Sequence, residues 1–117
     1  MRTLFIINDP PYGSERVYNA LRLAQALLKR EPAPPLTLFL MADAVLAAKA
    51  AQKTPDGYYN VERMLKRIIG GNGTVLLCGT CMDARGLSEA ELIPGTRRSS
   101  MDELAAATGE AEKVLVF

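Results

Sequence analysis

The sequence contains no histidine and only two cysteines among its 117 residues. Structural zinc is usually held by four Cys or His ligands, so only a site shared between subunits would supply enough of them. We therefore expect no metal site, and we expect no cofactor. The two cysteines, Cys78 and Cys81, stand three positions apart. In a reducing compartment such cysteines are better interpreted as a reactive or ligating pair than as a structural disulfide.

Tryptophan is also absent, and aromatic residues make up only 6% of the chain. The core must then consist mainly of Leu, Ile, Val, Ala and Met, which suits helices packed on a sheet. Hydrophobic residues at 49% and charged residues at 23% are typical of a chain that folds. The length fits one domain over residues 1–117.

The chain has neither an excess of one charge nor a long hydrophobic run. A net charge of +1 gives no broad field that would attract a nucleic acid or an anionic membrane. The apolar start of the chain ends at Asn8-Asp9-Pro10, which is too early for a signal peptide or a membrane span. We expect a cytoplasmic protein that binds neither nucleic acid nor membrane.

Short apolar runs separated by helical patterns predict an α/β fold. The expected strands are Thr3–Asn8, Leu36–Met41, Thr74–Leu77 and Val114–Phe117. Runs that are apolar on both faces are typical of parallel strands covered on two sides. Alternating strands and helices imply right-handed crossovers. We therefore predict a three-layer α/β/α sandwich around a mainly parallel sheet.

Polar residues and glycines mark the ends of the expected helices. The expected N-caps are Ser14, Asp43, Asn60 and Ser100, the last in a capping box with Glu103. The first helix is expected to run to about Lys29, and Gly70-Gly71 to end the helix that Asn60 begins. Thr54-Pro55-Asp56-Gly57 predicts a turn, and Ser88–Leu92 predicts a helical turn.

The segment that begins at Cys78 directly follows the third expected strand. Ligands of open α/β sheets bind at the carboxyl ends of strands, so a site is expected here. A helix start after Cys78 would bring backbone N–H groups and the positive end of a helix dipole near its sulfur, which favours the reactive thiolate. Arg85 would add positive charge if the loop folds back. We predict a lowered pKa for Cys78.

A simpler interpretation of the cysteines stays open. Free cysteine often packs in a core as a small apolar residue, and Cys78 alone would be interpreted in that way. The second thiol at C-x-x-C spacing favours chemistry, because two such thiols can form a disulfide or pass on a mixed disulfide. Asp9 and Tyr12 follow the first strand on the same edge and could line a crevice there, although such loop residues are also ordinary turn formers.

The segment Cys78-Gly-Thr-Cys-Met-Asp-Ala-Arg-Gly86, placed after the third strand of a chain of this length, resembles the DsrE/DsrF-like family, also called the YchN-like fold. The likeness extends over essentially the whole chain. It implies a parallel sheet between helices and assembly into trimers or hexamers. In the best-understood members it also implies a sulfur relay, in which a cysteine carries a persulfide between a donor protein and an acceptor protein.

The resemblance also assigns roles to residues of the loop. In the sulfur carriers Arg-Gly follows the cysteine seven and eight residues later, as Arg85-Gly86 follow Cys78 here. Cys78 is therefore the expected sulfur acceptor. Cys81 departs from the single-cysteine pattern and could resolve a persulfide, releasing sulfide and leaving a disulfide. The expected binding residues of the same edge are Gly79, Thr80, Asp83, Arg85, Asp9 and Tyr12.

The expected function is that of a persulfide carrier or a sulfurtransferase-like protein. Two alternatives stay open. One is a thiol-disulfide redox protein that uses the C-x-x-C pair, although thioredoxin-like folds typically carry this pair after their first strand. The other is a non-catalytic oligomeric module in which the cysteines bind a partner or a ligand.

Overall fold

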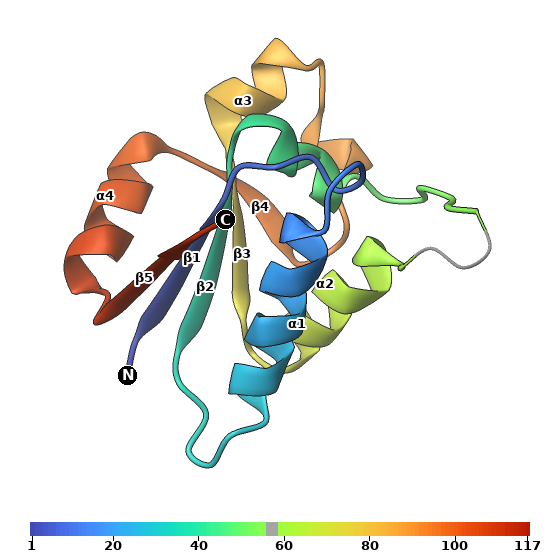
Figure 1. Cartoon of the computed structure of the whole chain (residues 1–117). Helices are drawn as coiled ribbons and strands as arrows, with labels where there is room; N and C mark the ends of the chain where they lie inside the picture. The colour runs from blue at the N-terminus through green and yellow to red at the C-terminus, as the bar shows by residue number, and fades with distance from the viewer. Residues whose placement is uncertain (56–58) are drawn as a thin grey trace.

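The protein folds around a single sheet of five parallel strands in the order β4-β3-β2-β1-β5. The computed structural model describes residues 1–55 and 59–117. The strands are β1 (Thr3–Ile7), β2 (Leu36–Leu40), β3 (Thr74–Cys78), β4 (Thr96–Ser99) and β5 (Lys113–Val116). Figure 1 shows the sheet between two layers of helices, as the sequence predicts.

The three central strands are apolar because both of their faces are covered. Phe5 of β1 and Leu38 and Phe39 of β2 have no exposed surface. Side chains that alternate along these strands face opposite sides of the sheet, so neighbouring buried residues require cover on both sides. At the edges, by contrast, β5 has no fully buried residue and β4 has only Ser99.

The helices bury one apolar stripe each. Helix α1 (Arg16–Leu28) packs through Val17, Ala20, Leu21 and Ala24, which recur at helical spacing. Helix α2 (Val61–Gly70) packs through Val61, Met64, Leu65 and Ile68. These two helices lie side by side on one face of the sheet, and α4 (Met101–Glu110) lies on the other face (Figure 1). Helix α4 buries only Leu104, so this layer is much thinner.

Three short helical segments gather near the carboxyl edge of the sheet. The 3₁₀ helix η1 (Ala42–Ala48) follows β2, and α3 (Gly79–Ala84) follows β3 without an intervening loop. A second 3₁₀ turn, η2 (Glu89–Glu91), lies between α3 and β4. Loops at the carboxyl ends of parallel strands share one edge, which brings η1 and α3 together. No helix in the described part of the chain is long and apolar enough to cross a membrane.

Several expected caps and stops are confirmed. The Asn60 side chain accepts from the N–H of Arg63, and α2 ends at Gly70 with Gly71 as its C-cap. The helical turn after Ser88 is present as η2. The predicted turn from residue 54 to 57 falls partly on residues 56 and 57, which lie outside the described residues.

Two other capping predictions are wrong, and the capping box at Ser100 is confirmed only for its N-cap half. Glu15 is the N-cap of α1, and Ser14 donates instead to Asp9. Met41 is the N-cap of η1, while Asp43 sits in the first turn. Ser100 accepts from the N–H of Glu103, but the Glu103 carboxylate turns to Arg97 and Ser99.

The strand β4 was not expected from the sequence. Its residues Thr96-Arg97-Arg98-Ser99 are polar, so they carry no hydrophobic signal. An edge strand needs only one partner, and β4 pairs with β3 alone, with Ser99 opposite Cys78. The sheet therefore has five strands where the sequence predicted four.

Candidate functional site

Cys78 is both the last residue of β3 and the N-cap of α3. An N-cap side chain accepts a hydrogen bond from the N–H of a residue two or three positions later. The C-x-x-C spacing therefore aims the backbone N–H of Cys81 at the sulfur of Cys78, at 3.4 Å. The Thr80 hydroxyl lies 3.3 Å from the same sulfur. The local fold thus places a backbone N–H and a hydroxyl against one sulfur.

These contacts set the acidity of the first thiol. Burial by itself raises the pKa of Cys78, whose residue surface is only 4% exposed. The hydrogen bonds from Cys81 and Thr80 outweigh burial, and the pKa of Cys78 is lowered from its ordinary value. Hydrogen bonds to a charged form stabilise that form. The lowered pKa of Cys78 agrees with the sequence prediction. Its cause is hydrogen bonding from Cys81 and Thr80 rather than the dipole of a long helix.

Cys81 has the opposite tendency. Burial and the hydrogen bond with Cys78 raise the pKa of Cys81, and the amide of Ala42 together with the charge of Arg85 offsets only part of that rise. Both cysteines are free thiols, Cys78 buried and Cys81 half-buried. The pair thus consists of a thiol whose pKa is lowered and a more exposed thiol whose pKa is raised.

The Cys81 sulfur is held from η1. The N–H of Ala42 donates to the Sγ of Cys81 at 3.2 Å. Ala42 adopts a φ of 52°, in the left-handed region that costs an alanine roughly 1–2 kcal/mol. Strained backbone of this kind concentrates at functional sites. The hydrogen bond from Ala42 places the start of η1 at the site, a feature that no sequence pattern indicated.

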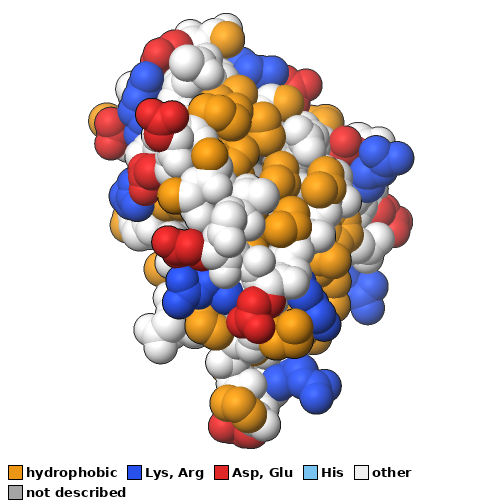
Figure 2. Space-filling view, turned by 90° about the vertical axis from the view of Figure 1, so that its left-hand side faces the viewer, with side chains coloured by type: hydrophobic (Ala, Val, Ile, Leu, Met, Phe, Trp, Pro, Cys, Tyr) orange, Lys and Arg blue, Asp and Glu red, His pale blue; other side chains and the backbone are white. Residues whose placement is uncertain are grey.

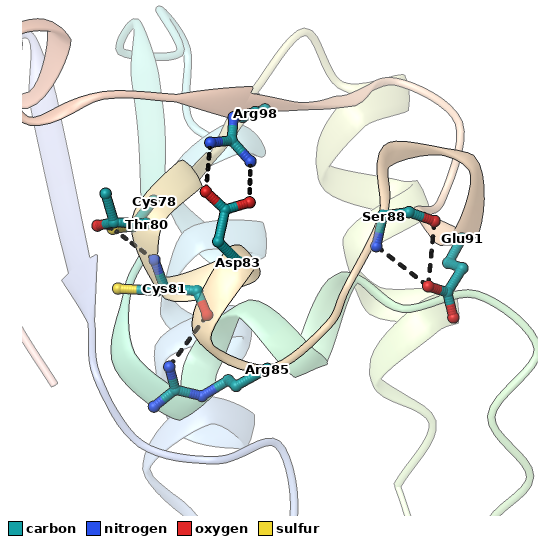
Figure 3. A network of polar contacts seen from close by, with 8 residues as sticks. All are labelled: Cys78, Thr80, Cys81, Asp83, Arg85, Ser88, Glu91 and Arg98. Atoms are coloured by element: carbon teal, nitrogen blue, oxygen red, sulfur yellow. Dashed lines mark hydrogen bonds and ion pairs between the residues drawn. The ribbon is translucent and has the colours of Figure 1, made fainter.

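Arg85 folds back over the cysteine loop, which is the arrangement in which it was expected to add positive charge there. Its Nη1 donates to the Cys81 carbonyl oxygen at 3.0 Å, and its Nε and Nη2 both lie 2.8 Å from Asp43 Oδ1. Asp43 therefore joins η1 to α3 and does not cap a helix. Figure 3 shows Arg85 below the turn that carries Cys81.

Asp83 and Arg98 form a second ion pair on the other side of α3. Two hydrogen bonds of 2.7 and 2.9 Å join the guanidinium to the carboxylate, and they lower the pKa of Asp83 (Figure 3). The Arg98 side chain crosses Gly79 so closely that a Cβ at Gly79 would lie 2.7 Å from Arg98 Nε. Arg98 comes from the unexpected strand β4, so sequence reasoning missed it. Because glycine has no Cβ, Gly79 leaves room for this close approach of Arg98.

Asp9 and Tyr12 contact residues at or just before the starts of α1 and α2. Asp9 accepts from Ser14 and lies 3.7 Å from Arg16. Tyr12 stacks on Tyr59 and accepts from the N–H of Val61. Both residues are on the expected edge, and their binding role stays a prediction. Within the described residues no group of three or more Cys, Asp or Glu side chains is placed to hold a metal ion.

The whole chain, residues 1–117, matches one protein family. It belongs to the DsrE/DsrF-like family. This family is associated with sulfur metabolism. The resemblance seen in the cysteine segment is thereby confirmed at the level of the family.

Relatives and solved structures agree with this assignment. The chain is 45% identical over 116 residues to protein YchN of Escherichia coli strain K12, covering 99% of this chain and 98% of that protein. It is 38% identical over 118 residues to the uncharacterized protein MJ0989 of Methanocaldococcus jannaschii, covering all of both. The crystal structure of the E. coli ychN protein matches with a TM-score of 0.92 at 46% identity over the full length of both chains.

A more distant structure supports the fold alone. The protein of unknown function MTH1491 from Methanobacterium thermoautotrophicum matches with a TM-score of 0.81 at 13% identity, covering 99% of this chain and 98% of that one. The predicted YchN-like α/β architecture is therefore confirmed.

Proposed function

We propose that the protein is a cytoplasmic sulfur carrier in which Cys78 accepts a sulfane sulfur and passes it on. The thiolate of Cys78 attacks the outer sulfur of a donor persulfide, R–S–SH. The S–S bond of the donor breaks, R–S⁻ leaves, and Cys78–S–SH remains. The observation that carries the proposal is the position of the Cys78 sulfur where β3 ends and α3 begins, in contact with the N–H of Cys81 and the hydroxyl of Thr80, which lower the pKa of Cys78.

The location of the pair supports a protein donor. Cys78 ends β3 at the carboxyl edge of the sheet and Cys81 follows in α3, and neither is among the residues that line the cavities of 440 and 370 Å³ in the described part of the chain. A donor that carries its sulfur on its own surface can approach such an edge, whereas a small molecule gains affinity mainly from burial in a pocket. Opening of the turn around Thr80 is needed for access, because Cys78 is 4% exposed.

Cys81 governs how long the sulfur is kept. Its thiolate would attack the inner sulfur of Cys78–S–SH, release HS⁻ and leave a Cys78–Cys81 disulfide, which an external dithiol must reduce. Because the pKa of Cys81 is raised, this thiol stays protonated at neutral pH and the carried sulfur is retained.

The test is sulfur loading measured by intact mass. The reduced protein is incubated with glutathione persulfide, and wild type should gain the mass of one sulfur atom. Cys78→Ser should gain none, and Cys81→Ser should gain one and keep it longer than wild type. Equal gain by Cys78→Ser, or no gain by wild type, would contradict the proposal.

The two free thiols also favour a second function, that of a thiol-disulfide redox protein. A C-x-x-C pair with one lowered and one raised pKa matches the division between an attacking and a resolving thiol. Equilibration with glutathione buffers of graded potential distinguishes the two functions. A midpoint between about −270 and −120 mV would favour the redox function, because known dithiol carriers lie there.

We also propose that copies of the chain assemble through the face formed by α4 and β5. Large hydrophobic side chains are exposed here, with Met101 at 57%, Val114 at 41% and Val116 at 66%. Figure 2 views this side of the molecule and shows a broad area of hydrophobic side chains. The edge strand β5 and the thin α4 layer leave apolar surface that a second copy would cover.

Light scattering after size-exclusion chromatography tests the assembly. Wild type should elute with the mass of a trimer or hexamer, and Val116→Lys should shift toward the monomer. Ala26→Lys adds the same charge on α1, on the other face of the sheet, and should keep the wild-type mass. A monomeric wild type, or equal shifts in both variants, would contradict the proposed face.

A further inference from the structure

A groove between α1 and α2 collects positive charge. A cavity of about 440 Å³ is lined from both helices, and an adjoining one of about 370 Å³ shares Gln25, Lys29 and Arg67 with it. The basic residues of the groove are Arg22, Lys29, Arg63 and Arg67. No Asp or Glu occurs among the described residues that line either cavity. The groove is therefore far more basic than the chain as a whole, whose net charge is +1.

These four cations are not neutralised within the described part of the chain. The ion pairs found there involve other cations: Arg2, Arg16, Lys49, Lys66, Arg85, Arg97 and Arg98. Arg22 donates to the Asn19 side chain and lies 5.6 Å over the Tyr18 ring, which leaves its charge uncompensated. Among the residues that the structure describes, none of the four groove cations thus has a carboxylate partner.

The shape of the groove indicates an elongated ligand. Arg22 of α1 and Lys29, the C-cap of α1, are seven residues apart, which places them about 10 Å apart along the helix axis. Arg63 and Arg67 are one turn apart on α2, and α1 and α2 lie side by side (Figure 1). Between the cations the groove presents Tyr18, Ala26 and Met64. Charges along both walls with apolar surface between them suit a chain that carries carboxylates and some apolar side chains.

We propose that the α1–α2 groove docks an acidic segment of a partner protein. Its carboxylates bind Arg22, Lys29, Arg63 and Arg67, and an apolar side chain rests on Tyr18 and Met64. A protein segment is favoured over a nucleic acid because the charge is confined to one groove of a nearly neutral chain. This docking needs no sulfur chemistry, so it can be confirmed or contradicted independently of the proposed carrier function.

Fluorescence anisotropy with a defined probe tests the docking. The probe is a fluorescein-labelled peptide of repeated Glu-Glu-Leu, and a single-stranded RNA of matched length is run beside it, both at low ionic strength. Wild type should bind the peptide more tightly than the RNA, and added salt should weaken the binding. Absence of peptide binding, or tighter binding of the RNA, would overturn the proposal.

Charge-reversal variants locate the binding. Arg63→Glu with Arg67→Glu should weaken peptide binding about tenfold or more. Arg30→Glu with Lys113→Glu makes the same change of charge in a separate cavity and should weaken it much less. Arg22→Gln with Lys29→Gln is a second groove variant and should also weaken peptide binding. Circular dichroism checks that all three double variants are folded. Equal losses in groove and control variants would show a general charge effect and overturn the groove as the site.

Discussion

The backbone N–H of Ala42 donates to the sulfur of Cys81 across 3.2 Å, although the two residues are 39 positions apart. The loop after β2 therefore holds the second thiol of a pair whose first thiol ends β3. Because strands β2 and β3 are parallel neighbours, both loops emerge at the same edge. The two thiols differ in acidity because the hydrogen bonds from Cys81 and Thr80 outweigh burial at Cys78, whereas burial and the hydrogen bond with Cys78 outweigh the Ala42 amide at Cys81.

Thr80→Val should make Cys78 less acidic. The change removes a hydroxyl 3.3 Å from the Cys78 sulfur, so the pKa of Cys78 should rise and less thiolate should be present at neutral pH. Loss of one hydrogen bond of about 1 kcal/mol should slow alkylation of Cys78 by iodoacetamide roughly threefold to tenfold. The control Thr108→Val removes a hydroxyl that bonds the Leu104 carbonyl in α4, and it should leave the rate unchanged. Equal rates in wild type and Thr80→Val would refute this role of Thr80.

Ala42→Gly should stabilise the protein while preserving the Cys81 contact. Glycine adopts a φ of 52° freely, so relief of the alanine strain should exceed the added flexibility of the unfolded chain by about 0.5–1 kcal/mol. Urea unfolding measures the gain. Ala106→Gly, in the exposed part of α4, should instead cost about 1 kcal/mol. Alkylation of Cys81 should be unaltered in Ala42→Gly, and a loss of stability there would contradict the strain.

Gly79→Ala should displace Arg98 from Asp83. The new methyl would lie 2.7 Å from Arg98 Nε, so the flexible arginine side chain has to move and its two hydrogen bonds are lost. A double-mutant cycle in urea tests this. Gly79→Ala should destabilise the wild-type background more than the Arg98→Ala background. If the two changes are additive, the close approach does not matter for stability.

Acid should weaken the junction between β4 and α4 through Glu103. Hydrogen bonds from Arg97 and Ser99 lower the pKa of Glu103 to about 2. An unfolded glutamate titrates near ~4.3, so the stabilisation is complete above that pH and is lost as the pH falls toward 2. The difference in urea midpoint between wild type and Glu103→Gln should therefore shrink as the pH falls from about 5 to about 2. A constant difference over that range would show that the pKa of Glu103 is ordinary.

The parts of the fold that the sequence predicted well are those determined by local chemistry. Apolar runs located β1, β2, β3 and β5, and the side-chain oxygen of Asn60 marked the start of α2. Cys78 was placed at a strand end because its apolar run stops there and a C-x-x-C turn follows. Arg85 folds back over the loop as expected, but it pairs with Asp43 and its charge lowers the pKa of Cys81 rather than that of Cys78.

The parts that escaped prediction depend on distant partners. Arg98 appears in the sequence as a surface cation, and only the pairing of β4 with β3 brings it across Gly79. Asp43 has the residue type of a helix cap, yet its partner Arg85 lies 42 positions away. Ala42 in a left-handed conformation has no residue-type signal, since glycine or asparagine is expected there.

The ladder between β1 and β5 has a consequence for the order in which the molecule opens. It joins Thr3 to Lys113, at opposite ends of the chain, so a very long loop must close before it forms. The adjacent α4 adds only Leu104 to the core, and little apolar burial holds this unit in place. In a single copy of the chain, with this face uncovered, amide hydrogens of α4 and β5 should accordingly exchange with solvent first, while those of β2 and β3 persist until the molecule unfolds as a whole.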